Sequence, residues 1–299
     1  MAAPAKTRRS HARTRGSHAR IATAARIAQC PYDRRAPPPV TCPRMMSLRE
    51  RWGNGGTTIG AWLSNPSAIS AELAARIGFD YVCVDNQHGA VDYQASIGMI
   101  QAVLLGGSRP LARAPWNEPG SIAKLLDAGA EGVIVPMVNS ASEAVAVVRA
   151  CRSPPAGARS FGPTIVGMRH DDYLSHAKEN IAVIPMIETA EAISNLDAIV
   201  AVPGIDAVYV GPADLSVSLG LAPRNNDGEA TFDDALVTIV AACRGAGVVP
   251  GIHTTAALVP RRLEQGFRML TVSTDLVAMR SAMADDLAIA RRGSATFSV

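Results

Sequence analysis

The sequence of 299 residues is 48% apolar and 18% charged, a balance that provides for a large buried core and excludes an intrinsically disordered chain. No apolar run reaches the roughly 18 residues of a membrane-spanning helix, and the basic N-terminus lacks the apolar segment of a secretory signal, so we predict a cytoplasmic enzyme. Five widely spaced cysteines without a C-x-x-C pair argue against a disulfide framework or a thiolate zinc site, and Cys83 and Cys243 are expected in the core.

The net charge of +3 hides a strongly basic first segment. Residues 1–45 carry ten of the 29 Lys and Arg but only one of the 26 Asp and Glu, so the remainder has a net charge of −6. This head is predicted to be disordered, with the structured domain at 46–299. It fits a nucleic-acid-binding arm, a transit peptide, or a translation start that lies at Met45 or Met46. We favour the last, and expect no nucleic-acid binding, because the head lacks interleaved aromatic residues.

From residue 57 onward, short β-branched apolar runs alternate with longer amphipathic segments, which is the pattern of parallel βα units. Several runs are apolar at nearly every position (VIVPMV, AVIPMI, AVYV), as strands covered on both faces must be. Eight strands are predicted, at 57–63, 81–85, 109–114, 132–138, 181–188, 207–211, 249–253 and 269–274.

Helical patterns fill the intervals, for example at 67–78, 141–152 and 233–247. Glycines end several of them, as expected of the residue that accepts the left-handed conformation at a helix terminus: Gly78, Gly129 and Gly247. Repeated βα units without a hairpin signal form either a closed barrel or a doubly wound open sheet. Eight units favour the barrel, so we predict an α/β fold, a (β/α)8 TIM barrel with its active site on the loops that follow the strands. The Gly-rich phosphate motifs of dinucleotide-binding and P-loop folds are missing.

A titratable side chain, His88, and a cationic side chain, Arg113, are predicted at the mouth of this barrel. His88 lies three residues beyond the second strand, in D-N-Q-H-G, and its ordinary pKa suits proton transfer near neutrality, although a structural hydrogen bond is the alternative. Arg113 ends the third strand, where its planar guanidinium matches a substrate carboxylate or, alternatively, a structural ion-pair partner.

Two carboxylates are predicted at neighbouring strand ends. Glu188 ends the fifth strand, and Asp214 follows the sixth in G-P-A-D. Such a pair repels itself unless a proton or a cation lies between the two groups, and Mg²⁺ is satisfied by one or two protein carboxylates. The sequence therefore predicts a divalent-cation site, with the alternative that Glu188 caps the helix that follows it.

Lysine positions restrict the mechanism. The chain has three lysines, Lys6 in the head and Lys124 and Lys178 in helical or polar segments, and none lies on a predicted strand. An enzyme that forms a Schiff base with a carbonyl substrate needs a lysine amine directed at that carbonyl. That chemistry is excluded, whereas metal-assisted enolate stabilisation remains open.

Seven motifs occur in one order along the chain: D-N-Q-H-G, R-A-P-W-N, L-L-D-A-G-A, V-P-M-V, P-P-A-G-A-R, I-E-T-x-E-A and G-P-A-D-L-S. Together they closely resemble the HpcH/HpaI aldolase family, of the 4-hydroxy-2-oxoheptanedioate and 2-dehydro-3-deoxy-sugar-acid aldolase type. The resemblance covers about residues 47–291. It implies a (β/α)8 barrel whose C-terminal helix is exchanged between subunits, in a homo-oligomer that is usually a hexamer built from dimers.

The resemblance also implies roles for individual residues. Glu188 and Asp214 would hold Mg²⁺, Mn²⁺ or Co²⁺, and Arg113 would bind the carboxylate and the 2-oxo oxygen of pyruvate. His88 would work with Asp127, on the third helix of the predicted barrel, on the proton of the C4 hydroxyl, and Asp85 matches a further acid of the site.

Two positions depart from the family pattern. Gln87 stands where an acid usually precedes the histidine, and Met186 stands where the sugar-acid branch commonly has Gln. Both are expected to contact the substrate, as is Ala213 beside Asp214, so the departures concern substrate choice and rate.

The predicted function is a metal-dependent aldolase that cleaves 4-hydroxy-2-oxo acids to pyruvate, or a related 2-oxo acid, and an aldehyde. One alternative is a carbon–carbon lyase of acyl-CoA thioesters, like the citrate lyase β-subunit, although the acidic body offers little for CoA phosphates. The other is a barrel that only binds 2-oxo acids, against which the presence of His88, Arg113, Glu188 and Asp214 in one chain argues.

Overall fold

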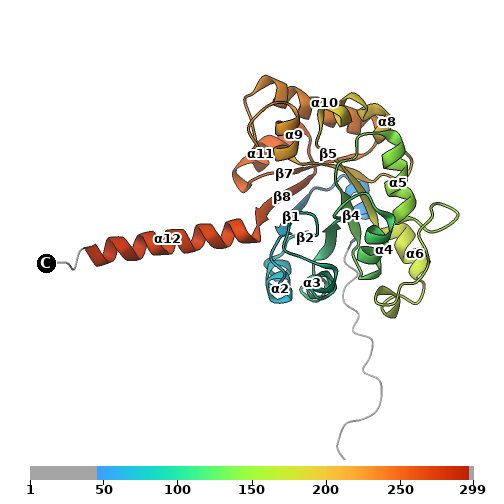
Figure 1. Cartoon of the computed structure of the whole chain (residues 1–299), viewed down its shortest axis with the longest axis horizontal. Helices are drawn as coiled ribbons and strands as arrows, with labels where there is room; N and C mark the ends of the chain where they lie inside the picture. The colour runs from blue at the N-terminus through green and yellow to red at the C-terminus, as the bar shows by residue number, and fades with distance from the viewer. Residues whose placement is uncertain (1–45, 296–299) are drawn as a thin grey trace, which may run out of the picture. The chain divides into compact units, whose positions relative to one another are not determined.

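The computed structural model describes residues 46–295, and the predicted head at 1–45 lies outside the described residues. Eight parallel strands pair in chain order and close into a barrel surrounded by helices, which confirms the predicted fold (Figure 1). The strands are β1 (Thr58–Leu63), β2 (Tyr81–Asp85), β3 (Arg109–Arg113), β4 (Gly132–Val135), β5 (Ala182–Ile187), β6 (Ala207–Val210), β7 (Val249–His253) and β8 (Met269–Thr274).

The strand bounds follow the prediction to within a residue, except for β4. The predicted strand at 132–138 ends at Val135, and Met137 takes a positive φ of 56°, a conformation incompatible with an extended strand. The N–H of Met137 is thereby directed toward the mouth of the barrel, where it has a role described below.

Along the chain, helices fill the intervals between successive strands, with the first before β1 and the last after β8. They are α1 (Leu48–Gly53), α2 (Ala68–Ile77), α3 (Tyr93–Leu105), α4 (Pro119–Asp127), α5 (Ala141–Cys151), α6 (Tyr173–Asn180), α7 (Ala190–Ser194), α8 (Leu196–Val200), α9 (Pro212–Ser218), α10 (Ala230–Ala246), α11 (Val259–Gln265) and α12 (Asp275–Ala295), with short 3-10 turns η1 (Val166–Met168) and η2 (Ala256–Leu258). The three predicted helices correspond to α2, α5 and α10. The three glycines expected at helix ends all have positive φ.

Side chains of successive strand residues point alternately into the barrel and toward the helices. In β2, Tyr81 and Cys83 belong to the inner cluster, whereas Val82 and Val84 belong to the larger cluster between strands and helices. Helix α1 covers the N-terminal end of the barrel, because its Leu48 and Trp52 join the inner cluster. The C-terminal end is therefore the open one, as in other barrels of this type.

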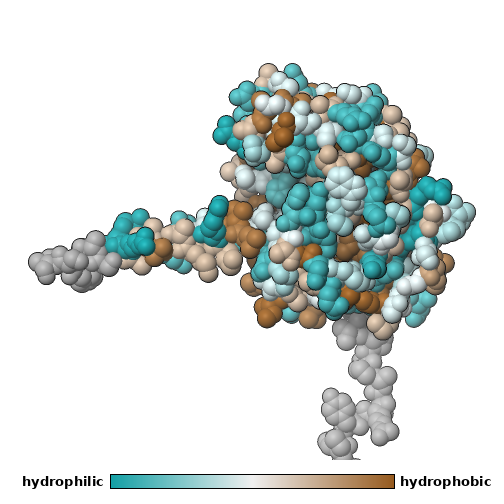
Figure 2. Space-filling model, in the orientation of Figure 1, coloured by the Kyte–Doolittle hydropathy of each residue, from teal (hydrophilic) through white to brown (hydrophobic). Residues whose placement is uncertain are grey.

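Helix α12 differs from the other long helices, because its side chains are exposed from Leu276 to Arg292. It runs clear of the barrel, and apolar residues appear near its base (Figures 1 and 2). Six large apolar side chains of α12 are exposed by 44–65%: Leu276, Val277, Met279, Met283, Leu287 and Ile289. In the described part of the chain, no helix combines the length and the apolar character that a membrane crossing requires.

Candidate active site

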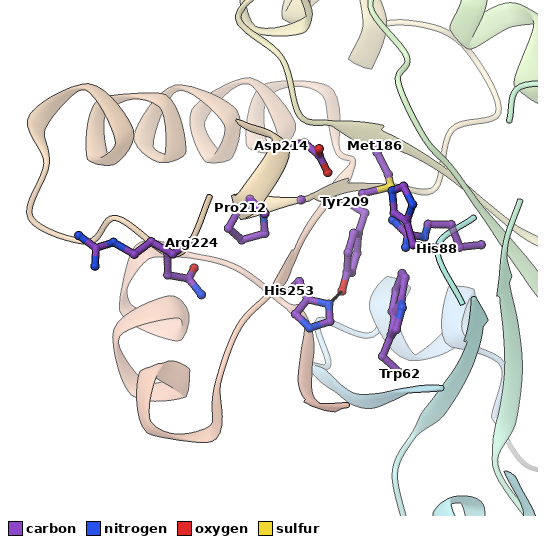
Figure 3. Close-up of a pocket in the computed structure, with 12 residues that line it drawn as sticks. Trp62, His88, Met186, Tyr209, Pro212, Asp214, Arg224 and His253 are labelled. Atoms are coloured by element: carbon purple, nitrogen blue, oxygen red, sulfur yellow. Dashed lines mark hydrogen bonds between the residues drawn. The ribbon is translucent and has the colours of Figure 1, made fainter. Parts of the chain in front are cut away.

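A cavity of about 300 Å³ lies at the C-terminal end of the barrel (Figure 3). Its walls come from five strand ends, from the loops after β2, β6 and α9, and from the first turn of α9. The lining residues are Trp62, His88, Arg113, Met186, Tyr209, Gly211, Pro212, Ala213, Asp214, Arg224, Asn225 and His253. Five of the predicted site residues are among them: His88, Arg113, Met186, Ala213 and Asp214.

Arg113 is held by a buried ion pair with Asp85. Its Nε donates to Asp85 Oδ1 (2.8 Å) and its Nη2 to Oδ2 (2.7 Å), while the guanidinium lies 5.0 Å from the centre of the Trp62 ring system. Burial alone would raise the pKa of Asp85, but hydrogen bonds and charge from Arg113 outweigh it and lower that pKa. Asp85 therefore stays ionised and orients the guanidinium, so the ion pair and the predicted anion-binding role of Arg113 are compatible.

Asp85 also shapes the loop that carries His88. Its Oδ1 accepts hydrogen bonds from the backbone N–H groups of Gln87 (3.0 Å) and His88 (3.3 Å). At the next position a Cβ would lie 2.3 Å from the Asp85 carbonyl oxygen, so only glycine fits at Gly89. The turn leaves the His88 side chain exposed in the cavity wall, accessible to a substrate hydroxyl.

Glu188 carries the most perturbed carboxyl of the site. The residue is 1% exposed; its Oε1 accepts the Met137 N–H (2.7 Å), whereas Oε2 is buried without a hydrogen-bond partner. Burial first, and the charge of Asp214 second, raise its pKa to about 7, against the lowering effects of Met137 and Arg113. The following helix is capped by Thr189, whose side chain accepts the Ala192 N–H, so the alternative that Glu188 is the cap is wrong.

The two carboxylates fit a divalent cation. Gly211 of the cavity wall lies against Glu188 Oε2, because a Cβ at position 211 would come within 2.6 Å of this oxygen, so any larger residue there would clash with it. Asp214, in the first turn of α9, is exposed at the cavity wall. Among residues 46–295, no cluster of three or more His, Cys, Asp or Glu is spaced to hold a metal ion. A resident cation would thus have two protein carboxylates and complete its coordination with water and substrate, as Mg²⁺ does.

The buried carboxyl makes a prediction for metal-free protein. In the folded protein the pKa of Glu188 is about 7, above the ordinary 4.5. Protonated Glu188 therefore contributes its full share to the free energy of unfolding at low pH, and this stabilisation is lost as the pH rises through 7. The difference in unfolding free energy between wild type and Glu188→Gln should therefore change by on the order of 3 kcal/mol between pH 4.5 and 8. Denaturant titrations in EDTA at several pH values measure this difference. If the free energies of unfolding of the two proteins had the same pH dependence, the raised pKa of a buried Glu188 carboxyl would be contradicted.

Four predicted site residues are not among the residues that line the cavity: Asp85 and Glu188, described above, and Asp127 and Gln87. Asp127 is the last residue of α4, toward the N-terminal end of the barrel, and it accepts a 2.5 Å hydrogen bond from Arg159 Nη2. The structure therefore does not bring Asp127 to His88 within one chain. Gln87 lies beside the mouth with its Oε1 buried and unpaired.

Sequence reasoning missed Trp62, Tyr209, His253 and the pair Arg224 and Asn225. Trp62 and His253 could have been predicted as site residues, because polar or aromatic groups near the C-terminal ends of barrel strands face the site. Tyr209 lies inside an apolar strand run, and its stacking on Trp62 at 5.6 Å depends on barrel closure. Arg224 and Asn225 lie in the loop after α9, and nothing in the sequence of this loop indicates that it reaches the mouth of the barrel.

Comparison with known proteins gives consistent relatives. Residues 58–282 match the family model described as HpcH/HpaI aldolase/citrate lyase. The chain is 38% identical to a hydroxypyruvate/pyruvate aldolase of Rhizorhabdus wittichii, over 83% of this chain and 99% of that protein. It is 40% identical to a 4-hydroxy-2-oxo-heptane-1,7-dioate aldolase of Salmonella dublin, over 74% and 85%. A crystal structure of an HpcH/HpaI aldolase/citrate lyase family protein from Burkholderia cenocepacia has a TM-score of 0.76 and 32% identity, over 83% and 100%.

Proposed function

This chain belongs to the HpcH/HpaI aldolase/citrate lyase family, and from that premise we propose that it is a divalent-metal-dependent aldolase that cleaves 4-hydroxy-2-oxo acids to pyruvate, or a related 2-oxo acid, and an aldehyde. The observation that carries the proposal is the unpaired, buried Glu188 Oε2, which lies against Gly211 of the cavity wall and interacts electrostatically with Asp214. Within residues 46–295 no group hydrogen-bonds this oxygen, and a bound cation would satisfy it.

Glu188 and Asp214 would hold Mg²⁺, Mn²⁺ or Co²⁺, which supplies Lewis-acid stabilisation of the negative charge that develops on the 2-oxo oxygen. Arg113, oriented by Asp85, donates hydrogen bonds to the carboxylate and 2-oxo oxygens of the substrate. His88 accepts the proton of the C4 hydroxyl as the C3–C4 bond breaks. Met186 and Ala213, in the cavity wall, and Gln87 beside it bound the space for the rest of the substrate.

The main alternative is a carbon–carbon lyase that acts on acyl-CoA thioesters. The two activities differ in product: the first releases free pyruvate, the second an acyl-CoA. A panel of 4-hydroxy-2-oxo acids and hydroxyacyl-CoA thioesters, assayed for both products with Mg²⁺ or Mn²⁺, distinguishes them. The proposal requires metal-dependent pyruvate release from the oxo acids; acyl-CoA formation without it would replace this proposal with the alternative.

We propose further that α12 is exchanged between subunits of a homo-oligomer. A second cavity, of about 320 Å³, lies between α2, the outer face of β1 and the base of α12, and Leu63, Leu73, Ile77 and Phe79 are among the residues that line it. Leu73 and Ile77 are exposed by 64% and 69%, an apolar surface that monomers rarely leave open. The apolar side chains along α12 are the matching occupant, supplied by a second copy.

Assembly also bears on Asp127. Since Asp127 lies away from the mouth of its own barrel, its proposed partnership with His88 requires the mouth of a neighbouring subunit. His88→Ala and Asp127→Asn are each expected to lose about 10²-fold or more of the cleavage rate.

Co-expressing the two variants with different tags tests this arrangement. Sites shared between subunits should recover about one quarter of wild-type activity in a randomly assembled 1:1 mixture, because one site in four then receives both intact residues, and about one half in dimers purified through both tags. If His88 and Asp127 acted within one chain, no mixed oligomer would recover activity.

A further inference from the structure

A chain of hydroxyl groups runs from the barrel interior to the cavity wall. Tyr209 donates its hydroxyl proton to Thr271 Oγ1 (2.6 Å), which also lies 2.9 Å from the Tyr81 hydroxyl. Tyr81, Tyr209 and Thr271 are at most 1% exposed. The chain ends at His253, the last residue of β7, whose Nδ1 lies 3.3 Å from the Tyr209 oxygen (Figure 3).

This chain favours the tautomer of His253 that carries its proton on Nδ1. Tyr209 has one proton, and the shorter contact, to Thr271, uses it. The Tyr209 oxygen therefore accepts from His253 Nδ1–H, and Nε2 keeps its lone pair. Thr274 Oγ1 lies 3.4 Å from Nε2, a long distance for an O–H···N bond, so Nε2 retains capacity for a closer donor.

The imidazole is neutral at physiological pH. Burial, with a further contribution from the charge of Arg113, lowers the pKa of His253 to about 4, and Asp85 opposes this only partly. A neutral ring in the wall of the cavity, with only the long Thr274 contact at an unprotonated Nε2, accepts a hydrogen bond at that nitrogen and donates none from it. It does not attract a carboxylate or phosphate.

His253 and His88 would accept different protons. Both line the cavity, and the rings of His253 and Trp62 pack edge to face with 5.4 Å between their centres. A hydroxyl has one proton, so the hydroxyl that gives its proton to His88 cannot also donate one to His253.

We propose that His253 is a specificity-determining residue that accepts a hydrogen bond from a second hydroxyl of the substrate, so that the enzyme favours hydroxylated reactants. This rests on the proposed function. The second hydroxyl has two sources, carbon 3 of the 2-oxo acid or the carbon chain of the aldehyde. Both present the same O–H group to Nε2.

Aldol addition with matched reactants identifies the source. Hydroxypyruvate is compared with pyruvate at a fixed concentration of acetaldehyde, and glycolaldehyde is compared with acetaldehyde at a fixed concentration of pyruvate. His253→Phe should lower kcat/KM by about tenfold or more for the hydroxylated member of one pair and leave its unhydroxylated partner nearly unchanged. His253→Gln, which keeps an acceptor oxygen, should restore part of the loss. His170→Phe repeats the replacement outside the cavity and should change neither ratio.

A second measurement does not depend on His253 variants being folded. Two-bond ¹H–¹⁵N correlation spectra of the wild type should show a protonated Nδ1 and an unprotonated Nε2 for His253. Thr271→Val removes the acceptor that takes the Tyr209 proton and should shift the tautomer equilibrium toward Nε2–H, with the hydroxyl preference falling in parallel.

The outcomes separate the two proposals. Absence of aldol addition with every reactant pair would remove the proposed function itself. Aldol addition with unchanged hydroxyl preference in His253→Phe, or a wild-type Nε2 that carries the proton, would overturn the role of His253 alone.

Discussion

Glu188→Gln and Asp214→Asn are each expected to reduce cleavage and divalent-cation affinity by more than about 100-fold. Each change replaces an anionic oxygen with a neutral one while keeping the shape of the side chain. Loss of residues that only support a metal ligand already costs 10- to 100-fold, so loss of a ligand should exceed that range. Titration calorimetry with Mn²⁺ and pyruvate-release kinetics at increasing metal concentration measure the two effects.

A matched control is available in the neighbouring helix. Glu191, three residues after Glu188, is exposed in the first turn of α7, so Glu191→Gln removes the same charge nearby and should leave turnover unchanged. A normal rate from either site variant without added metal, or an equal loss in the control, would show that the cation site has been assigned to the wrong carboxylates.

His88→Ala is expected to separate the two halves of the reaction. Cleavage should fall by about 10²- to 10⁴-fold, because the general base for the C4 hydroxyl is lost. Exchange of the pyruvate methyl protons with solvent should persist, because enolate formation depends on Arg113 and on the groups at Glu188 and Asp214. Arg113 variants should depress both activities, since the same substrate oxygens are held in each.

The Arg113 comparison needs a conservative substitution, because Arg113→Ala leaves the buried Asp85 carboxylate without its partner. Arg113→Lys keeps the charge and loses only the two-pronged contact. Both activities of His88→Ala and Arg113→Lys are measured at saturating metal, with thermal melts to confirm folding. If His88→Ala lost both activities equally while Arg113→Lys retained exchange, the two roles would have to be abandoned.

The barrel was predictable because its signals are local. Eight apolar runs at βα spacing define the strands, and the glycines at positions 78, 129 and 247 mark helix ends by their backbone conformation. The early end of β4 was not predictable, since the positive φ of Met137 brings its N–H to Glu188, a contact between residues 51 positions apart. Nothing in the motif V-P-M-V indicates that Met137 takes a positive φ.

The site was only partly predictable, for a similar reason. Strand-end positions predict His88, Arg113, Glu188 and Asp214 as site residues, because each carries a polar group where a buried strand stops, and three of them line the cavity: His88, Arg113 and Asp214. The buried chain from Tyr81 through Thr271 and Tyr209 to His253 joins four strands, and each member looks like an ordinary strand residue by itself. Asp127 is the opposite case. Its motif predicts a role in the site, but its position at the end of α4 places it away from the mouth of the barrel in the same chain.

Hydrogen–deuterium exchange at the pyruvate methyl group, followed by proton NMR in deuterated water, tests the proposed carboxylate pair most directly. This measurement isolates enolate formation by the mouth residues, with no aldehyde and no choice of aldol substrate. We expect exchange with Mg²⁺ or Mn²⁺, its loss in EDTA, and its return on adding metal, with Glu188→Gln inactive throughout. Equal exchange by wild type in EDTA and by Glu188→Gln would contradict a cation-assisted enolate at this carboxylate pair.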